Sequence, residues 1–306
     1  MVHWIQMMEN AGIPFLIWLQ SFQNDALTAI MRFFSYLGTE YFFLLLLPLL
    51  YWSISKRWGI MVALALIFAG YGMNLSKWLT NTPRPDAAKV AVLWHETSPS
   101  FVSGHAATAM AVWGTLGAVV RRTWFWIVAA LLIFFIGLSR LYLGVHYPVD
   151  VVGGWLLGLM IAFWVVLLVP RWAPGLALRR TSFLLALALG AALLMLFLHP
   201  AGGIPRQWPA SGAAQFAGLF LGMAAGLVWD VKKLHFLPSG PWWRRLLRLL
   251  AGLLVLAVFY VLPKLLFDAL GDMPSLLAQV LRMLRYALVG WVVSGLAPWL
   301  FIRLRL

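Results

Sequence analysis

The sequence contains no cysteine, and only 10% of its 306 residues are charged. The lack of cysteine excludes disulfide bonds, thiol nucleophiles and zinc ribbons, so any chemistry must come from histidine, aspartate, serine, lysine and arginine. A soluble domain carries about 25% charged residues, whereas 63% of this chain is hydrophobic and its mean hydropathy is +0.89. The composition therefore predicts an integral membrane protein.

Acidic residues are also scarce, with 9 Asp and Glu against 23 Lys and Arg, which gives a net charge of +14. The basic residues lie in short clusters between apolar runs, a pattern typical of membrane topology, so nucleic-acid binding is excluded. Cytoplasmic loops are enriched in Lys and Arg. The loops assigned to that side carry Lys56/Arg57, Arg121/Arg122, Arg171/Arg179/Arg180, Lys232/Lys233/Arg244/Arg245/Arg248 and Arg303/Arg305.

Nine apolar runs have a length near that needed to cross a hydrocarbon core of about 30 Å. They predict an all-α, polytopic bundle with about nine membrane spans. The runs are 41–55, 58–78, 104–121, 123–142, 149–170, 181–199, 211–230, 246–267 and 279–302.

We expect three regions along the chain. Residues 1–40 combine a short apolar run with an amphipathic stretch, which favours interfacial helices over a cleaved signal peptide. Residues 41–170 hold the candidate chemistry, and residues 171–306 are interpreted as transmembrane scaffold. In the scaffold, glycines at four-residue spacing predict close helix packing within the chain or, alternatively, a homodimer seam. These glycines are Gly218, Gly222 and Gly226.

Three clusters of polar residues fall at the ends of the predicted spans, on the side opposite the basic loops. Ionisable groups near a bilayer are costly, so they persist where they pair, line water or do chemistry. The clusters are KWLTNTPRP with Lys77 and Arg84, SFVSGHA with Ser103, Gly104 and His105, and SRLYLGVHYPVD with Arg140, His146 and Asp150.

The three cations Lys77, Arg84 and Arg140 predict a phosphate-binding site. Arginine offers a planar fork of donors that matches phosphate oxygens, and lysine adds a compact point charge. Each residue alone is better explained as an anchor at a helix end. Together, and beside two histidines, they favour a bound phosphate.

The other two clusters predict an anion site and a nucleophile. Ser103 suits a helix N-cap, and Gly104 allows the backbone amides to approach an anion at the positive end of the helix. The spacing of His146 and Asp150 lets the carboxylate fix one tautomer of the imidazole, leaving the other nitrogen nucleophilic. A helix cap and a structural pair are the alternatives. No metal site is predicted, because no H-E-x-x-H pair occurs and nearby cations would repel a metal ion.

Three segments, taken in order, resemble the three motifs of the type 2 phosphatidic acid phosphatase (PAP2) superfamily. They are K-x6-R-P (Lys77 to Pro85), S-G-H (Ser103 to His105) and S-R-x5-H-x3-D (Ser139 to Asp150). The resemblance covers roughly residues 40–170. One departure is Val102, where the family usually has proline. Nine spans with a lumenal active face are similar to the sphingosine-1-phosphate phosphatase and glucose-6-phosphatase branches, and the stretch LGTEYFFLLLLPLLYW resembles the former.

The resemblance implies a metal-independent and cofactor-independent phosphatase mechanism. His146 attacks phosphorus and forms a phosphohistidine, Asp150 orients it, and His105 protonates the leaving oxygen. The remaining residues of the motifs stabilise charge on the phosphate oxygens. They are Lys77, Arg84, Arg140, Ser103 and Gly104.

We expect the substrate to be a lipid monophosphate or a prenyl diphosphate, surrounded by membrane lipids. The expected membrane is the bacterial cytoplasmic membrane, with the site facing the periplasm or exterior. Alternatives on the same residues are hydrolysis of a sugar phosphate and phosphotransfer between lipids. A vanadate-dependent haloperoxidase is disfavoured, because that group is typically soluble. A protein that only binds or transports lipid phosphates is disfavoured, because His105 and His146 are both present.

Overall fold

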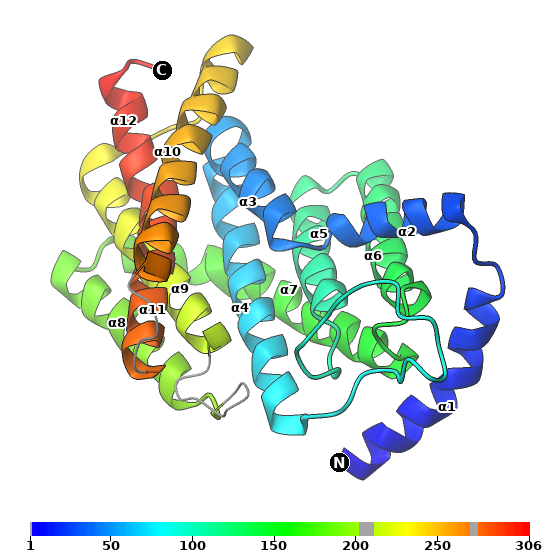
Figure 1. Ribbon diagram of the computed structural model, residues 1–306. Helices are drawn as coiled ribbons and strands as arrows, with labels where there is room; N and C mark the ends of the chain where they lie inside the picture. Colours follow the sequence, from blue (N-terminus) through cyan, green and yellow to red (C-terminus); the bar gives the residue numbers. More distant parts are fainter. Residues whose placement is uncertain (1, 202–210, 270–274) are drawn as a thin grey trace. The chain divides into compact units, whose positions relative to one another are not determined.

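The computed structural model describes residues 2–201, 211–269 and 275–306, and every regular element within these ranges is a helix (Figure 1). This confirms the predicted all-α class. The elements are α1 (Val2–Gln20), α2 (Asp25–Tyr36), α3 (Glu40–Leu49), η1 (Leu50–Ile54), α4 (Lys56–Thr80), α5 (Gly104–Val120), α6 (Thr123–Tyr142), α7 (Pro148–Ala177), α8 (Thr181–Phe197), α9 (Ser211–Trp229), η2 (Asp230–Leu234), α10 (Trp242–Ala269), α11 (Ser275–Trp291), η3 (Val292–Leu296) and α12 (Ala297–Arg303).

The chain is a multi-pass membrane protein with fewer spans than the sequence predicts. In the described residues, six helical segments are long and apolar enough to cross a membrane, and α2 with α3 and η1 adds a seventh if this bent pair is one span. The expected number, about nine, is therefore too high when spans are counted by length and composition. α5 and α8 have 17 residues each and extend about 26 Å, less than a hydrocarbon core of about 30 Å.

The chain divides into two compact units, and the first contains Met1–Leu44 and Phe68–Val166. Close packing of α5 on α7 brings two of the sequence clusters together. A Cβ atom on Gly154 would lie 2.6 Å from the Ser103 carbonyl oxygen, and one on Gly158 would lie 2.4 Å from that of Ala107. Because these glycines lack a side chain, the start of α5 lies against the first turns of α7.

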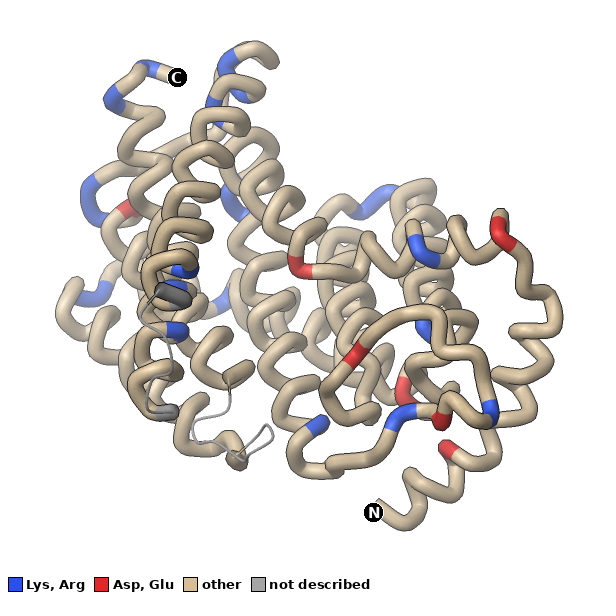
Figure 2. Tube along the Cα trace, in the orientation of Figure 1, with Lys and Arg blue, Asp and Glu red and all other residues tan. Residues whose placement is uncertain are grey.

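The loop 81–103 joins α4 to α5 and has no helix or strand of its own. Backbone hydrogen bonds fix it at two places, from the Leu93 amide to the Leu143 carbonyl (2.9 Å) and from the Ser100 amide to the Thr82 carbonyl (2.9 Å). A long loop in a compact unit is commonly functional. In Figure 2, acidic and basic residues gather around this loop.

The second unit contains Leu45–Ile67 and Leu167–Leu306. The predicted glycine face lies on α9 and packs against α11 of the same chain. A Cβ atom on Gly218 would lie 2.2 Å from the Met283 carbonyl oxygen, and one on Gly222 would lie 1.8 Å from that of Ala287. Gly226 lies similarly close to Ser294. The glycine face is thus occupied within the chain, which does not support the alternative of a homodimer seam.

Candidate active site

All eight residues of the predicted site lie in the first unit, at helix ends or in the connecting loops. Lys77 is in the last turn of α4, Arg140 is in the last turn of α6 and Asp150 is in the first turn of α7. Arg84 lies in the loop 81–103, and His146 lies in the turn between α6 and α7. Ser103, Gly104 and His105 form the start of α5.

His146 lies between a carboxylate and a guanidinium, which fixes its tautomer. Its Nδ1 atom is 3.1 Å from Asp150 Oδ2, and its Nε2 atom is 3.2 Å from Arg84 Nη1. Because a guanidinium only donates hydrogen bonds, Nε2 must be the acceptor, and the ring proton must lie on Nδ1. Nε2 is therefore the unprotonated ring nitrogen, and in this structure its lone pair accepts the hydrogen bond from Arg84.

The imidazole of His146 is held in its neutral form. Its side chain is almost completely buried, and burial lowers its pKa well below the usual value, an effect that the positive charges of Lys77, Arg84 and Arg140 strengthen. A neutral imidazole is the nucleophilic form. The cations that would bind a phosphate thus also keep the nucleophile unprotonated.

Asp150 is fixed by three donors on one oxygen. Besides His146, Oδ2 accepts hydrogen bonds from the Ser100 hydroxyl (2.5 Å) and from the Tyr147 amide (2.9 Å). Ser100 is fully buried and its hydroxyl also lies 3.4 Å from His146 Nδ1. Sequence reasoning missed Ser100, because a serine in the stretch SPSF gives no signal that it meets an aspartate fifty positions later.

Glu96 is a second residue that the sequence analysis missed. It accepts a hydrogen bond from the fully buried Arg140 guanidinium, and its other oxygen is 3.7 Å from Arg84 Nη2. Arg140 also donates to the Ser35 hydroxyl and lies 5.6 Å from the centre of the Trp94 ring. A single carboxylate therefore orients two of the three predicted phosphate-binding cations.

The remaining contacts of these cations are to backbone carbonyls and to one hydroxyl, that of Ser98, which accepts from Arg84 Nη2 at 3.2 Å. Arg84 donates from Nε to the Ser98 carbonyl (2.7 Å) and from Nη1 to the Val145 carbonyl (2.7 Å). Lys77 is buried and donates to the Pro99 carbonyl. Carbonyls orient a cation without cancelling its charge, so the site keeps a positive excess that favours an anion.

The start of α5 differs in one respect from the prediction. Ser103 occupies the N-cap position, but its hydroxyl makes no capping hydrogen bond. Ser103 Oγ, His105 Nε2 and Arg140 Nε are buried polar atoms without a hydrogen-bond partner among the residues that the structure describes. Buried polar atoms are normally paired, so these three, together with the unpartnered Asp150 Oδ1, mark a site whose hydrogen bonds are incomplete.

The space beside Gly104 is filled by protein. A Cβ atom there would lie 3.1 Å from the Cε atom of Met73, so the absent side chain makes room for α4. Gly38 likewise makes room for His105, because a Cβ atom added at Gly38 would lie 2.7 Å from the imidazole Cδ2. In the described part of the chain, no three His, Asp or Glu side chains are arranged to hold a metal ion.

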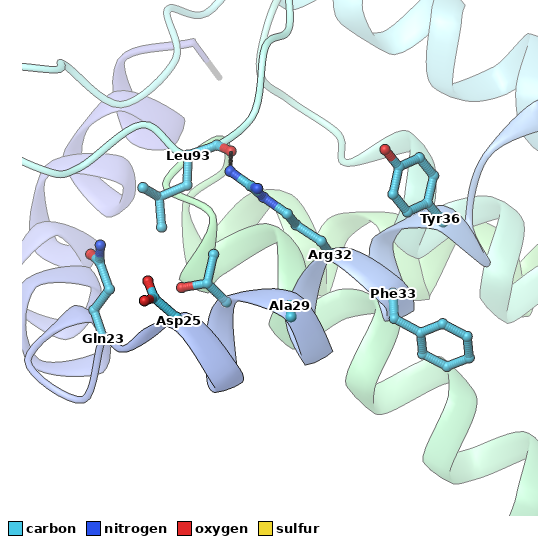
Figure 3. Close-up of a pocket in the computed structure, with 8 residues that line it drawn as sticks. Gln23, Asp25, Ala29, Arg32, Phe33, Tyr36 and Leu93 are labelled. Atoms are coloured by element: carbon cyan, nitrogen blue, oxygen red, sulfur yellow. Dashed lines mark hydrogen bonds between the residues drawn. The ribbon is translucent and has the colours of Figure 1, made fainter.

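An open hollow of about 640 Å³ lies along α2 (Figure 3), and His146 is not among the residues that line it. Arg32 reaches across it to the Leu93 carbonyl at 3.4 Å. The ring of Trp94, the next residue, contacts Tyr36 edge-on and lies under Arg140. The hollow therefore adjoins the loop that carries Glu96. Its lining residues are Gln23, Asp25, Thr28, Ala29, Arg32, Phe33, Tyr36 and Leu93.

Two models of known protein families together match most of this chain. Residues 58–174 match the PAP2 superfamily, and residues 214–306 match the transmembrane extension of PAP2 superfamily phosphatases. The first match includes all eight predicted site residues. α1 to α3 lie outside both.

Three curated relatives have related names. A probable sphingosine-1-phosphate phosphatase of Dictyostelium discoideum is 28% identical over 68% of this chain, but the alignment spans only 55% of that protein. Phosphatidylglycerophosphatase B of Bacillus subtilis is 30% identical over 47% of this chain and 74% of its own length. An undecaprenyl-diphosphatase of Sulfolobus acidocaldarius is 31% identical over 46% of this chain and 70% of its own length.

Two solved structures also align with about half of the chain. A PAP2-type phosphatidylglycerolphosphate phosphatase from Bacillus subtilis is 26% identical, with a TM-score of 0.46, over 51% of this chain and 83% of that one. LpxE from Aquifex aeolicus is 26% identical, with a TM-score of 0.45, over 51% of this chain and 94% of that one.

Proposed function

The chain belongs to the PAP2 superfamily, and from this premise we propose that it is a membrane phosphatase that hydrolyses lipid phosphates through a phosphohistidine on His146. The observation that carries the proposal is the tautomer of His146. Its Nδ1 proton is committed to Asp150, and its Nε2 lone pair lies 3.2 Å from Arg84, a predicted phosphate ligand. A phosphate bound by Arg84 would thus present phosphorus to the nucleophilic nitrogen.

The first chemical step transfers the phosphoryl group. His146 Nε2 forms a bond to phosphorus, and the bond from phosphorus to the ester oxygen breaks. His105 in its protonated form gives a proton to the departing oxygen, so the lipid alcohol leaves neutral. Burial and the charges of Arg140, Lys77 and Arg84 lower the pKa of His105 well below its usual value, so the negative charge of the bound phosphate must supply its protonation. The new phosphohistidine carries a positive ring, which the Asp150 carboxylate stabilises through the Nδ1 proton.

The second step releases phosphate. His105, now unprotonated, takes a proton from a water molecule that attacks phosphorus, and the bond to His146 Nε2 breaks. In both steps, negative charge develops on the equatorial oxygens. Lys77, Arg84 and Arg140, with the free Ser103 hydroxyl and the amides at the start of α5, are donors suited to bind it.

The site's position supports a lipid substrate. Lys77, Arg140 and Asp150 lie at the ends of helices that qualify as membrane spans, so a head group can reach them while its tail stays in the bilayer. The relatives are named for sphingosine-1-phosphate, phosphatidylglycerophosphate and undecaprenyl diphosphate, and all three are phosphates on a lipid. The basic loops favour a site on the extracytoplasmic face of a bacterial membrane.

The test is phosphate release by the purified protein in detergent with EDTA present. The substrates are phosphatidic acid, sphingosine-1-phosphate, phosphatidylglycerophosphate, undecaprenyl diphosphate and glucose-6-phosphate. We expect hydrolysis of at least one lipid, and we expect His146→Ala to lower kcat by about a thousandfold or more. His3→Ala, at an exposed histidine of α1, is the matched control. If the wild type and His146→Ala are equally active or equally silent on all five, the proposed function is wrong.

A further inference from the structure

The helix α2 lies outside both regions that match the family, yet it packs on α6, the helix that carries Arg140 (Figure 1). The hydroxyls of Thr28 and Tyr142 lie 2.8 Å apart, and the rings of Phe34 and Phe135 stack with their centres 4.9 Å apart. α2 is therefore fixed along the end of α6 at which this predicted phosphate ligand lies.

The packing of α2 brings a buried serine to the Arg140 guanidinium. Ser35 is fully buried, and its hydroxyl accepts a hydrogen bond from Arg140 Nη1. Arg140 Nη2 donates to Glu96, and the guanidinium lies 5.6 Å from the centre of the Trp94 ring. Both terminal nitrogens thus have an acceptor, whereas the buried Nε atom has no partner among the residues that the structure describes.

These contacts determine where the Nε–H bond of Arg140 points. A guanidinium is planar, so two acceptors, one at each terminal nitrogen, fix its plane and with it the direction of Nε–H. With Glu96 alone, the group could still turn about a single contact, because the arginine side chain is flexible. Ser35 supplies the second contact. Its hydroxyl is neutral, so it orients the guanidinium without cancelling the charge that attracts an anion.

We infer that Ser35 is a positioning residue, which holds Arg140 so that its Nε–H is presented to the phosphate group of the substrate. The inference rests on the proposed function, because Arg140 is a predicted ligand of that phosphate. A buried donor without a partner is uncommon in a folded protein, and a phosphate oxygen is a strong acceptor for it. Ser35 acts only through the arginine.

Kinetics of the full-length protein test this role. Ser35→Ala removes the second acceptor, so kcat/KM on the best lipid substrate should fall about tenfold. Ser35→Thr keeps the hydroxyl and should stay within about threefold of wild type. In an Arg140→Lys background there is no guanidinium to orient, so Ser35→Ala should cost less than about twofold further. Ser53→Ala is the matched control, because Ser53 is also buried and donates to the Arg245 carbonyl at 2.9 Å.

A second measurement does not need turnover. The Arg140 Nε–H resonance, identified in a ¹H–¹⁵N spectrum by its absence from Arg140→Lys, is followed while inorganic phosphate is added. We expect phosphate to shift this resonance in the wild type and in Ser53→Ala with the same Kd. In Ser35→Ala the Kd should rise about tenfold, since the donor is no longer held in place.

Losses that multiply in the double variant of Ser35→Ala and Arg140→Lys would overturn the inference, and so would a wild-type resonance that phosphate does not move. A lower melting temperature of Ser35→Ala with an unchanged Kd would show that Ser35 only stabilises the fold. None of these results concerns the nucleophile, so the phosphatase proposal would stand. Conversely, protein that is inactive on every lipid but binds phosphate in the Ser35-dependent way would contradict the phosphatase proposal and keep the role of Ser35.

Discussion

Both units bury charged groups, but they compensate them differently. In the second unit, Lys56 pairs with the fully buried Asp230, whose other oxygen accepts the Phe236 amide at 2.9 Å. The buried Arg248 donates to three backbone carbonyls, including Ser239 at 2.6 Å. In the first unit, two arginines share Glu96, and atoms of Ser103, His105 and Arg140 have no partner in the described structure. Arg282 Nε and Arg285 Nε of the second unit also lack a partner, so the difference lies in the clustering of cations around His146 in the first unit.

This contrast separates structural charges from those we propose to act on substrate. A paired buried charge fixes a conformation, and removing its partner destabilises the fold. A cluster with excess positive charge and free donors suits an anion that arrives from outside. The same substitution should therefore change activity in the first unit and stability in the second.

Asp150 is expected to show the largest effect. Asp150→Ala removes both the acceptor that fixes the His146 tautomer and the charge that stabilises the phosphohistidine, and should lower kcat about a thousandfold. Asp150→Asn keeps an acceptor oxygen for Ser100, Tyr147 and His146, so its loss should be nearer a hundredfold. Steady-state kinetics on the best lipid substrate would measure both. Equal losses would show that the tautomer is not what Asp150 secures.

Arginine replacement sharpens the comparison directly. Arg140→Lys loses the fork of donors that reaches Glu96 and Ser35, and should lower kcat/KM by about ten- to a hundredfold. The same change at Arg248 should lower the melting temperature while kcat/KM stays within about twofold. The two variants are compared by kinetics and by thermal unfolding in detergent. A fall in activity of equal size in both would mean that the units do not differ as described.

The ion pair of the second unit should matter for stability alone. Lys56→Met leaves the buried Asp230 carboxylate without its cation, and should destabilise the folded state by about 3 kcal/mol. Thermal unfolding would record the loss, with Lys89→Met in the loop 81–103 as a control, since Lys89 is exposed. A melting temperature equal to wild type would contradict a structural role for the pair.

The smallest expected effect concerns pH. Burial and three nearby cations lower the pKa of His146 well below its usual value, so the neutral form persists as the pH falls past that value. Between pH 8 and pH 6, the ring nitrogen chemical shifts of His146 should therefore stay constant in a ¹⁵N NMR titration. A protonation step near pH 6.5 would show that the cations do not keep the nucleophile neutral.

The sequence predicted the helices, and it placed the candidate site residues, because both leave local patterns. Each of the nine apolar runs contains a helix, although α5 and α8, with 17 residues each, are shorter than the helices that cross a membrane by length and composition. Spacing also placed His146 and Asp150 within contact distance, since residues four apart in a turn that enters a helix face each other.

Other features depend on contacts between distant residues, which no local pattern records. Ser100 meets Asp150, and Glu96 meets Arg140, only after the loop 81–103 has packed. The free hydroxyl of Ser103 was also unpredictable, because the same position and residue type normally cap a helix.

The central claim is that His146 becomes phosphorylated during turnover, and trapping that species tests it most directly. The protein would be mixed with a ³²P-labelled lipid phosphate, quenched with alkali within milliseconds and digested for mass spectrometry, with His146→Ala as the control. The account predicts label on the peptide that contains His146, stable in alkali and lost in acid, and no label in the variant. Active protein that carries no label, or carries it on another residue, would contradict the account.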